Sequence, residues 1–201
     1  MPKLPYSFYQ QEDVISLAKQ LLGKKLLTLI DGELTGGIIV ETEAYNGILD
    51  KASHAYNGRY TPRTSTMYKA GGVSYVYLCY GIHHLFNVVT GIEGNPHAVL
   101  IRGLAPMDGL STMLKRRNMQ SLMPKITAGP GALAKALGID KNLNSKDLLG
   151  NEIWIEDVGI QYLATEIISS PRVGIAYAED HALLPWRFYI KGNQFVSKPN
   201  S

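Results

Sequence analysis

Apolar residues at the start of the chain recur with the spacing of one helix face and then give way to strand-like segments. Residues 12–22 predict an amphipathic helix that ends at Gly23. Its apolar face consists of Val14, Ile15, Leu17, Ala18, Leu21 and Leu22. Residues 24–30 and 34–45 predict two strands, and Asp31-Gly32 between them is a strong signal for a tight turn. We therefore expect a helix followed by a β-hairpin.

A long polar stretch separates this hairpin from a second one. Residues 46–66 are rich in Gly, Asn, Pro, Arg and Thr, which predicts a loop, and a loop this long in a compact domain is more often functional than decorative. Residues 73–80 and 84–90 are aromatic and β-branched, which predicts two strands that reverse at Gly81. Tyr80 therefore falls at the tip of a hairpin, where a large aromatic residue calls for an explanation.

Short strands and helices are expected in the rest of the chain. The expected strands are residues 97–104, 152–156, 172–177 and 187–190. The expected helices are residues 107–119 and a second helix to Leu137, in which Pro130 suits the first turn. Within the second strand, Gly36-Gly37 predicts a bulge or a close approach of another strand. Because no repeat or linker divides the pattern, residues 1–201 are expected to form a single domain.

Composition is that of an ordinary globular protein, with 45% hydrophobic and 18% charged residues. Its one cysteine, Cys79, has no partner for an internal disulfide and lies in an apolar run, which favours a reducing compartment and a packing role. No apolar run reaches transmembrane length, and the first residues lack the apolar segment of a signal peptide. We expect an intracellular protein, cytoplasmic (with the nucleoid) in a bacterium or nuclear in a eukaryote.

Positive charge is concentrated in the middle of the chain. Residues 55–139 contain nine Lys and Arg against two acids, so this part carries +7 while the remainder carries −4. An uneven distribution of this kind predicts a surface that faces a polyanion. The alternative is a basic but merely solvated surface.

Two acids and a tyrosine stand at the end of the strand 34–45. Because side chains alternate along a strand, Ile39, Glu41, Glu43 and Tyr45 share one face. The opposite face is apolar or small, so we expect one face to be buried and the other to carry chemistry. The alternative is a solvated edge strand with two exposed acids, because glutamate is mostly a surface residue.

Several common chemistries have no motif here. His83 and His84 are adjacent and would point to opposite faces of a strand, and neither HExxH nor paired CxxC is present. The phosphate-binding patterns GxxxxGK[ST] and GxGxxG and the nucleophile pattern GxSxG are also absent from the sequence. We therefore expect neither a metal nor another cofactor.

Three functions remain open from these residues. A carboxylate, a long polar loop, tyrosines on a sheet and a basic middle fit a hydrolase that acts on a nucleobase extruded from a duplex. A nucleic-acid binding module without chemistry would use the same aromatic sheet, although it gives Glu43 no role. A hydrolase of nucleosides or glycans would use Glu41 and Glu43 as an acid pair, since residues two apart on a strand lie roughly 6 to 7 Å apart.

Motifs along nearly the whole chain resemble one known family. They are Glu41-Thr42-Glu43-Ala44-Tyr45, Thr61-Pro62-Arg63, residues 75–81, Asn87, Leu100-Ile101-Arg102, Gly129-Pro130, Arg172-Val173-Gly174 and Arg187-Phe188-Tyr189. In this order they resemble the alkyladenine (3-methyladenine) DNA glycosylase family. The resemblance implies a single compact α+β domain with a mostly antiparallel, curved sheet, packed helices and a protruding β-hairpin. It also implies a monomer without a metal.

The resemblance assigns chemical roles to two charged residues. Glu43 would activate water for attack on the anomeric carbon, and Arg102 would help to hold that water. For Arg102 the alternative is a structural ion pair with Glu41 or Glu43. Because no lysine in the matched segments stands where a Schiff base would form, the resemblance implies a monofunctional glycosylase.

The same resemblance assigns the remaining site residues and the substrate. The base pocket would consist of Tyr45, His54, Tyr77 and Asn87, and the DNA-intercalating residues would be Tyr80 and its apolar neighbour Ile82. In this assignment the Asn87 amide would clash with the 2-amino group of normal guanine. The implied partner is double-stranded DNA that contains damaged purines, namely 3-methyladenine, 7-methylguanine, hypoxanthine or ethenoadenine.

Overall fold

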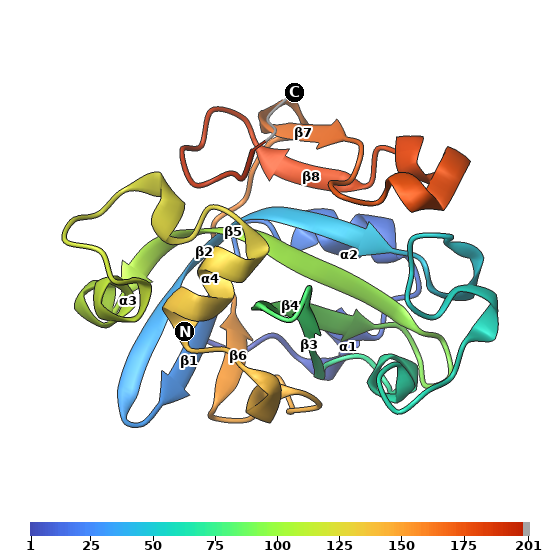
Figure 1. The fold of residues 1–201 in the computed structure, drawn as a ribbon, viewed down its shortest axis with the longest axis horizontal. Helices are drawn as coiled ribbons and strands as arrows, with labels where there is room; N and C mark the ends of the chain where they lie inside the picture. The colour runs from blue at the N-terminus through green and yellow to red at the C-terminus, as the bar shows by residue number, and fades with distance from the viewer. Residues whose placement is uncertain (199–201) are drawn as a thin grey trace.

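A computed structural model describes residues 1–198, and an eight-stranded sheet lies at its centre (Figure 1). The strands are β1 Lys25–Ile30, β2 Glu33–Tyr45, β3 Ser74–Cys79, β4 His83–Thr90, β5 His97–Asp108, β6 Ile153–Glu156, β7 Ile167–Ser170 and β8 Arg187–Ile190. Every pairing between them is antiparallel. The main order is β3-β4-β5-β2-β1-β6, while β8 joins β2 to β7.

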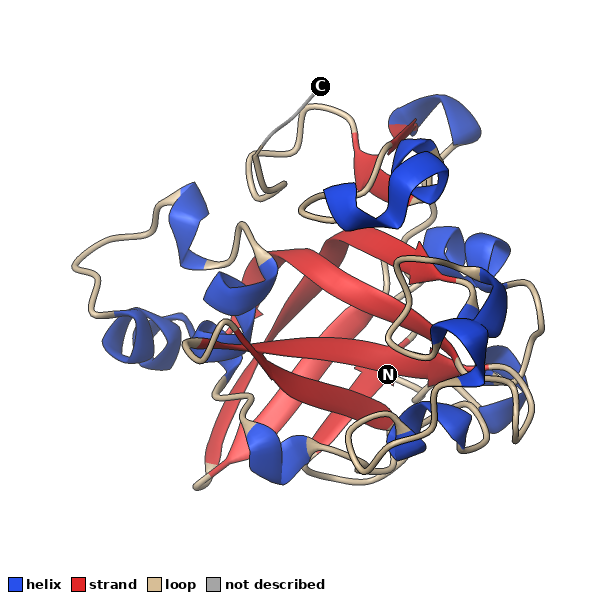
Figure 2. Cartoon of the chain, turned by 45° about the vertical axis from the view of Figure 1, so that its right-hand side comes forward, coloured by secondary structure: helices blue, strands red, loops and turns tan. Residues whose placement is uncertain are grey.

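Short helices pack around this sheet, which is twisted and curved (Figure 2). The α-helices are α1 Tyr6–Tyr9, α2 Val14–Gln20, α3 Leu110–Arg117 and α4 Pro130–Leu137. Single-turn and irregular 3₁₀ segments are Gly47–Leu49, Tyr56–Gly58, Ser65–Tyr68, Pro124–Ile126, Lys141–Leu143, Ala164–Glu166 and Ala176–Leu183. The predicted fold class, α+β with a mostly antiparallel, curved sheet and packed helices, is confirmed.

Strand β2 is the central element of the sheet. One edge of β2 pairs with β5 along nearly its whole length. The other edge pairs with β1 through residue 38 and with β8 over residues 41–43. Register shifts between Gly36 and Gly37 and again between Ile39 and Thr42 show that β2 is bulged, which bends the strand and strengthens its twist. The bulge or close approach predicted at Gly36-Gly37 is confirmed.

Helix α2 covers the middle of β2. The helix begins after Asp13, whose side chain accepts hydrogen bonds from the backbone N–H groups of Ile15 and Ser16. Its buried face contacts β2, where the Thr42 hydroxyl donates to the carbonyl of Ala18 at 2.9 Å. Both faces of β2 are therefore buried from residue 35 to residue 44. A solvated edge strand with exposed acids is excluded, and the face expected to carry chemistry is buried as well as the apolar one.

Strands β3 and β4 form a hairpin with an exposed tip. Its turn closes through a hydrogen bond from the Ile82 N–H to the Cys79 carbonyl, 3.1 Å long. Both central turn residues have positive φ, 49° at Tyr80 and 69° at Gly81, as a tight hairpin turn requires. Near the base of the turn, His83 packs against the start of α4. A Cβ at Gly131 would lie only 2.8 Å from the His83 Cγ, so this position needs glycine.

Three expected elements differ from the structure. Strand β5 continues to Asp108, because its end pairs with Gly36 of β2, and α3 therefore begins at Leu110 rather than at residue 107. No strand forms over residues 172–177. Strand β7 lies just before this segment and ends at Ser170, because the next residue, Pro171, has no N–H to donate to a neighbouring strand. Within residues 1–198, no helix is long and apolar enough to cross a membrane.

The close approach at Gly37 generates a stability prediction. A Cβ there would lie 2.2 Å from the Ala105 carbonyl oxygen and 2.4 Å from a Leu104 methyl carbon. We expect Gly37→Ala to lower the free energy of unfolding by about 2–3 kcal/mol, because β5 must shift away from β2. Urea unfolding measures this change.

A matched control separates this clash from the cost of backbone conformation. Gly32 has φ +79° but nothing within 4 Å of its missing Cβ. Gly32→Ala is expected to cost about 1 kcal/mol. Equal losses in the two variants would contradict the close approach.

Candidate active site

A cleft of about 700 Å³ opens where the hairpin β3–β4, the start of α4 and the segment after β7 meet. Its volume is in the range of small-molecule pockets. Six of the residues assigned to the site from the sequence line it, namely Tyr45, His54, Tyr77, Tyr80, Asn87 and Arg102. Residues that the sequence analysis did not assign to the site also line it, among them Arg63, Tyr75, Arg117, Val173 and Tyr177.

Glu43 is fully buried beside this cleft and has three partners. The Tyr45 hydroxyl donates to Oε2 at 2.9 Å, and the Val173 N–H donates to Oε1 at 2.7 Å. The Arg102 Nη1 lies 3.4 Å from Oε1. Burial raises the pKa of Tyr45 well above its usual value, and the charge of Glu43 adds to the effect, so Tyr45 stays a neutral hydrogen-bond donor.

Arg102 connects Glu43 to a second buried acid. Its Nε donates to Glu41 Oε1 at 2.8 Å, so Arg102 pairs with both glutamates, as the structural alternative predicted. Arg102 also lines the cleft, so its ion pairs do not exclude the expected role of holding the water molecule. Burial alone would lower the pKa of Arg102, but the charges of Glu43 and Glu41 outweigh burial and raise it.

Glu41 is held by donors on all sides. Besides Arg102, the Nε of Arg187 donates to its Oε1 at 2.7 Å. The N–H and the hydroxyl of Ser197 donate to it at 2.6 and 2.7 Å. With its oxygens occupied in this way, Glu41 is not available to protonate a leaving group. The acid pair of Glu41 and Glu43 that a glycan hydrolase would need is therefore not present.

Aromatic rings form the wall of the cleft. The rings of His54 and Tyr77 are 4.7 Å apart in an edge-on arrangement, and those of Tyr75 and Tyr77 are 5.3 Å apart. Tyr45 approaches from the end of β2. Stacked between such rings, a flat heteroaromatic ligand would gain both buried area and π contacts.

His54 is neutral, and its tautomer follows from its partners. Arg63 can only donate, so its Nη2, 3.3 Å away, makes the His54 Nε2 an acceptor. The Nδ1 therefore carries the proton and donates to the Tyr75 hydroxyl at 2.9 Å. Burial, together with the charges of Arg63 and Arg59, lowers the pKa of His54 to about 4. His54 thus contributes a ring and not a positive charge at neutral pH.

Asn87 is fixed at the inner wall of the cleft. It is buried on β4, and its Nδ2 donates to the carbonyl of Tyr75 at 3.1 Å. Because β3 and β4 pair at Tyr75 and Asn87, this side-chain bond spans one rung of the sheet. The amide is therefore held in place by the hairpin that carries the aromatic wall.

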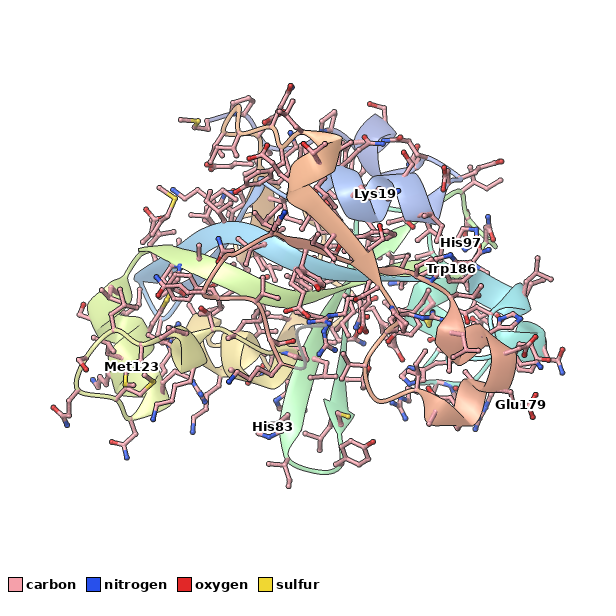
Figure 3. The ribbon with its side chains drawn as sticks, turned by 90° about the horizontal axis from the view of Figure 1, so that it is seen from above. Lys19, His83, His97, Met123, Glu179 and Trp186 are labelled. Atoms are coloured by element: carbon pink, nitrogen blue, oxygen red, sulfur yellow. The ribbon has the colours of Figure 1, made fainter. Side chains whose placement is uncertain are left out.

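The hairpin tip projects from the rim of the cleft (Figure 3), where His83 is labelled near its end. Tyr80 is 88% exposed and Ile82 is 73% exposed, so most of the surface of each residue is in contact with solvent. Tyr80 also has a positive φ of 49°, a conformation that costs a bulky residue free energy. A strained backbone together with an exposed aromatic ring indicates a surface that binds a partner.

Arg172 supports two residues that line the cleft, Tyr45 and Val173. Its guanidinium makes hydrogen bonds to both oxygens of Asp50 and lies between the rings of Tyr45 and Trp186, at 4.8 and 5.0 Å. Burial would raise the pKa of Asp50, but Arg172 outweighs burial and lowers it. Arg172 thereby fixes the Tyr45 ring and also the next residue, Val173, whose N–H meets Glu43.

Sequence reasoning missed these supporting contacts because no local pattern contains them. Arg172 and Asp50 are 122 residues apart, and Ser197 is 156 residues from Glu41. The available signal was that a buried arginine is usually paired with an acid, and this signal does not specify which acid. Within residues 1–198, no group of three or more His, Cys, Asp or Glu is placed to hold a metal ion.

A wall of aromatic rings receives a planar ring by stacking, and a buried carboxylate beside a guanidinium can activate water at its edge. This fold and this site fit one class of proteins, the hydrolases that take a base out of the helical stack before they act on it. The chain belongs to the methylpurine-DNA glycosylase family, whose sequence profile matches residues 7–194. The family resemblance and the predicted enzyme class, a monofunctional DNA glycosylase that hydrolyses N-glycosyl bonds, are confirmed.

Curated bacterial relatives cover almost the whole chain. A protein of Chlamydia felis is 49% identical over 93% of this chain and 95% of its own length. One from Desulfitobacterium hafniense is 45% identical over 98% and 99%, and one from Bacillus cereus is 44% identical over 96% and 98%. Each of the three carries the name "Putative 3-methyladenine DNA glycosylase".

The environment of His54 predicts its titration. In the folded protein we expect the His54 imidazole to titrate with a midpoint of about 4, measured by the NMR shift of its ring protons. Because the folded pKa lies below the unfolded value of about 6.5, His54 costs stability as the pH falls from 6.5 toward 4. Arg63→Gln should raise the midpoint only in part, since burial is the larger cause. A midpoint near 6.5 would contradict the buried, neutral ring.

Proposed function

We propose that the chain removes alkylated or deaminated purines from double-stranded DNA by hydrolysing the N-glycosidic bond with a water molecule activated by Glu43. The proposed substrates are 3-methyladenine, 7-methylguanine, hypoxanthine and ethenoadenine. The observation that carries the proposal is the position of Glu43, fully buried at the aromatic cleft and oriented by Tyr45 and Val173. The names of the curated relatives support the substrate class.

In the proposed step, Glu43 accepts a proton from water while the water oxygen bonds to the anomeric carbon. The bond from that carbon to the base breaks, and its electron pair leaves with the base. The carboxylate also stabilises the oxocarbenium-like transition state. Arg102 would hold the water, because its Nη1 lies at the Glu43 carboxylate while its Nε is fixed by Glu41.

The flipped base would stack among Tyr45, His54 and Tyr77. A cationic alkylated purine gains most from this wall, because π faces attract positive charge. Asn87 would exclude normal guanine by a clash with its 2-amino group. Its hydrogen bond to the Tyr75 carbonyl supports this role, since a tethered amide cannot swing aside.

Tyr80 would enter the DNA stack and fill the gap that the flipped base leaves, with Ile82 pressed against the adjacent base pair. Wedges of this kind cost unstacking energy, which phosphate contacts offset. Basic residues that line the cleft or lie in the loop beside it, among them Arg59 and Arg117, would supply those contacts. We infer that the chain acts as a monomer, inside the cell where DNA is accessible, and that the step needs no metal or cofactor.

The other two functions fit the geometry less well. A binding module gives no reason to bury Glu43 next to Arg102, since an ion pair out of water is weak support for stability. A nucleoside or glycan hydrolase would need a second available acid, and Glu41 is occupied by Arg102, Arg187 and Ser197.

Base release tests the proposal. A duplex oligonucleotide with one hypoxanthine or one ethenoadenine is incubated with wild type and with Glu43→Gln. We expect the substitution to lower the rate of release by about 10²- to 10⁴-fold or more, because the water loses its base. Lesion binding, measured by fluorescence anisotropy, should be retained.

Glu33→Gln is the matched control, because Glu33 is exposed at the other end of β2, where its carboxylate accepts a hydrogen bond from the Thr112 hydroxyl. It should release base at the wild-type rate. If wild type releases no base from either lesion or from 7-methylguanine DNA, the chain is a binding protein and the role of Glu43 is withdrawn.

A further inference from the structure

Arg63 places a positive charge on the aromatic wall of the cleft. Its guanidinium carbon lies 4.8 Å from the centre of the Tyr77 ring, and its Nη2 lies 3.3 Å from the His54 Nε2. The side chain is exposed on its outer side and lines the cleft on its inner side. A base stacked on Tyr77 would therefore have this guanidinium close to it.

The charge of Arg63 is not neutralised by the protein. In the described part of the chain, no carboxylate lies within 4.0 Å of its guanidinium. The other two arginines that line the cleft are held by other groups of the protein. Arg102 is paired with Glu41 and Glu43, and Arg117 donates to backbone carbonyls at residues 125 and 126. His54, beside Arg63, is neutral. Arg63 is thus a cation without a carboxylate partner that lies against the Tyr77 ring.

Two kinds of purine would meet this charge during the proposed reaction. A base alkylated at N7 or N3 is cationic, and when the glycosidic bond breaks, the electron pair of that bond leaves it neutral. Hypoxanthine is neutral, and the same electron pair leaves it as an anion until it takes a proton from solvent. In both cases the water oxygen bonds to the anomeric carbon and the water proton passes to Glu43.

We propose that Arg63 determines the preference of the site between neutral and cationic bases. Its guanidinium stabilises the negative charge that develops on a neutral leaving base and repels the positive charge of an alkylated one. Relative to free enzyme and free DNA, both effects favour neutral bases. The proposal rests on the proposed function and goes beyond it, because it assigns the discrimination by charge to one side chain of the wall.

The alternative role for an exposed arginine at this place is a phosphate contact. Such a contact weakens the binding of every duplex equally when it is removed. The two roles are separated by the ratio of the excision rates of two lesions, because a phosphate contact cancels in the ratio and a charge beside the base does not.

The experiment measures single-turnover release of hypoxanthine and of 7-methylguanine from the same duplex sequence, with the enzyme in excess over the DNA but below the dissociation constant, so that each rate is referred to free enzyme and free DNA. Arg63→Gln removes the charge and retains a side-chain donor for the His54 Nε2. We expect it to lower the ratio of hypoxanthine release to 7-methylguanine release by roughly three- to tenfold, which is the effect of one partly solvated charge near the base. Arg63→Lys keeps the charge and should keep the ratio within about twofold.

Arg59→Gln is the matched control, since Arg59 is an exposed cation in the same loop and does not line the cleft. It should slow both reactions by the same factor and leave the ratio unchanged. An unchanged ratio in Arg63→Gln, or a ratio that rises, overturns the proposal. A wild type that releases neither base refutes the proposed function itself, a result distinguishable from an unchanged ratio.

Discussion

The burial of two glutamates on the central strand is the constraint on which the rest of the structure depends. Glu41 and Glu43 are both fully buried, two residues apart on β2. Buried acids require cations and hydrogen-bond donors, and the loss of one partner from a buried pair typically costs about 3–5 kcal/mol. Arg102 comes from β5 and Arg187 from β8, while Ser197 comes from the end of the described chain. Two strands that pair with β2 thus also supply the cations that compensate the charges of its acids.

This compensation divides the two acids by function. Glu41 takes Arg187, Ser197 and the Nε of Arg102, so it serves as an anchor. Glu43 takes two lighter contacts, from Tyr45 and the Val173 backbone, and shares the outer nitrogen of Arg102 at 3.4 Å. An acid with this environment remains close to the cleft and retains the capacity to act on a water molecule. The anchored acid supports the role proposed for Glu43, because it fixes the guanidinium between them.

The cleft concentrates features that reduce stability. Tyr80 has a left-handed backbone and an exposed ring, and Arg63 carries an unneutralised charge beside a desolvated histidine. Such costs persist only where the surrounding structure fixes them. Here the pairing of β3 with β4 and the packing of His83 on Gly131 hold the hairpin in place. Rigid support beneath a strained tip suits the role proposed for Tyr80, in which the tip deforms the DNA and keeps its own shape.

The sequence by itself determined the local elements, because alternation, helical spacing and turn residues act over a few positions. It predicted α2, both hairpins and α4, and the motif order identified the family and six residues of the cleft. It failed where distant segments decide the outcome. Met107 and Asp108 joined β5 because Gly36 lies opposite them, and the segment after Pro171 turned inward to place Arg172 on Asp50. Only the tertiary structure decided which acid is anchored, that His54 is neutral and that Arg63 lies on Tyr77. Desolvation and charge pairing depend on groups that are far apart in the chain, and no local pattern encodes them.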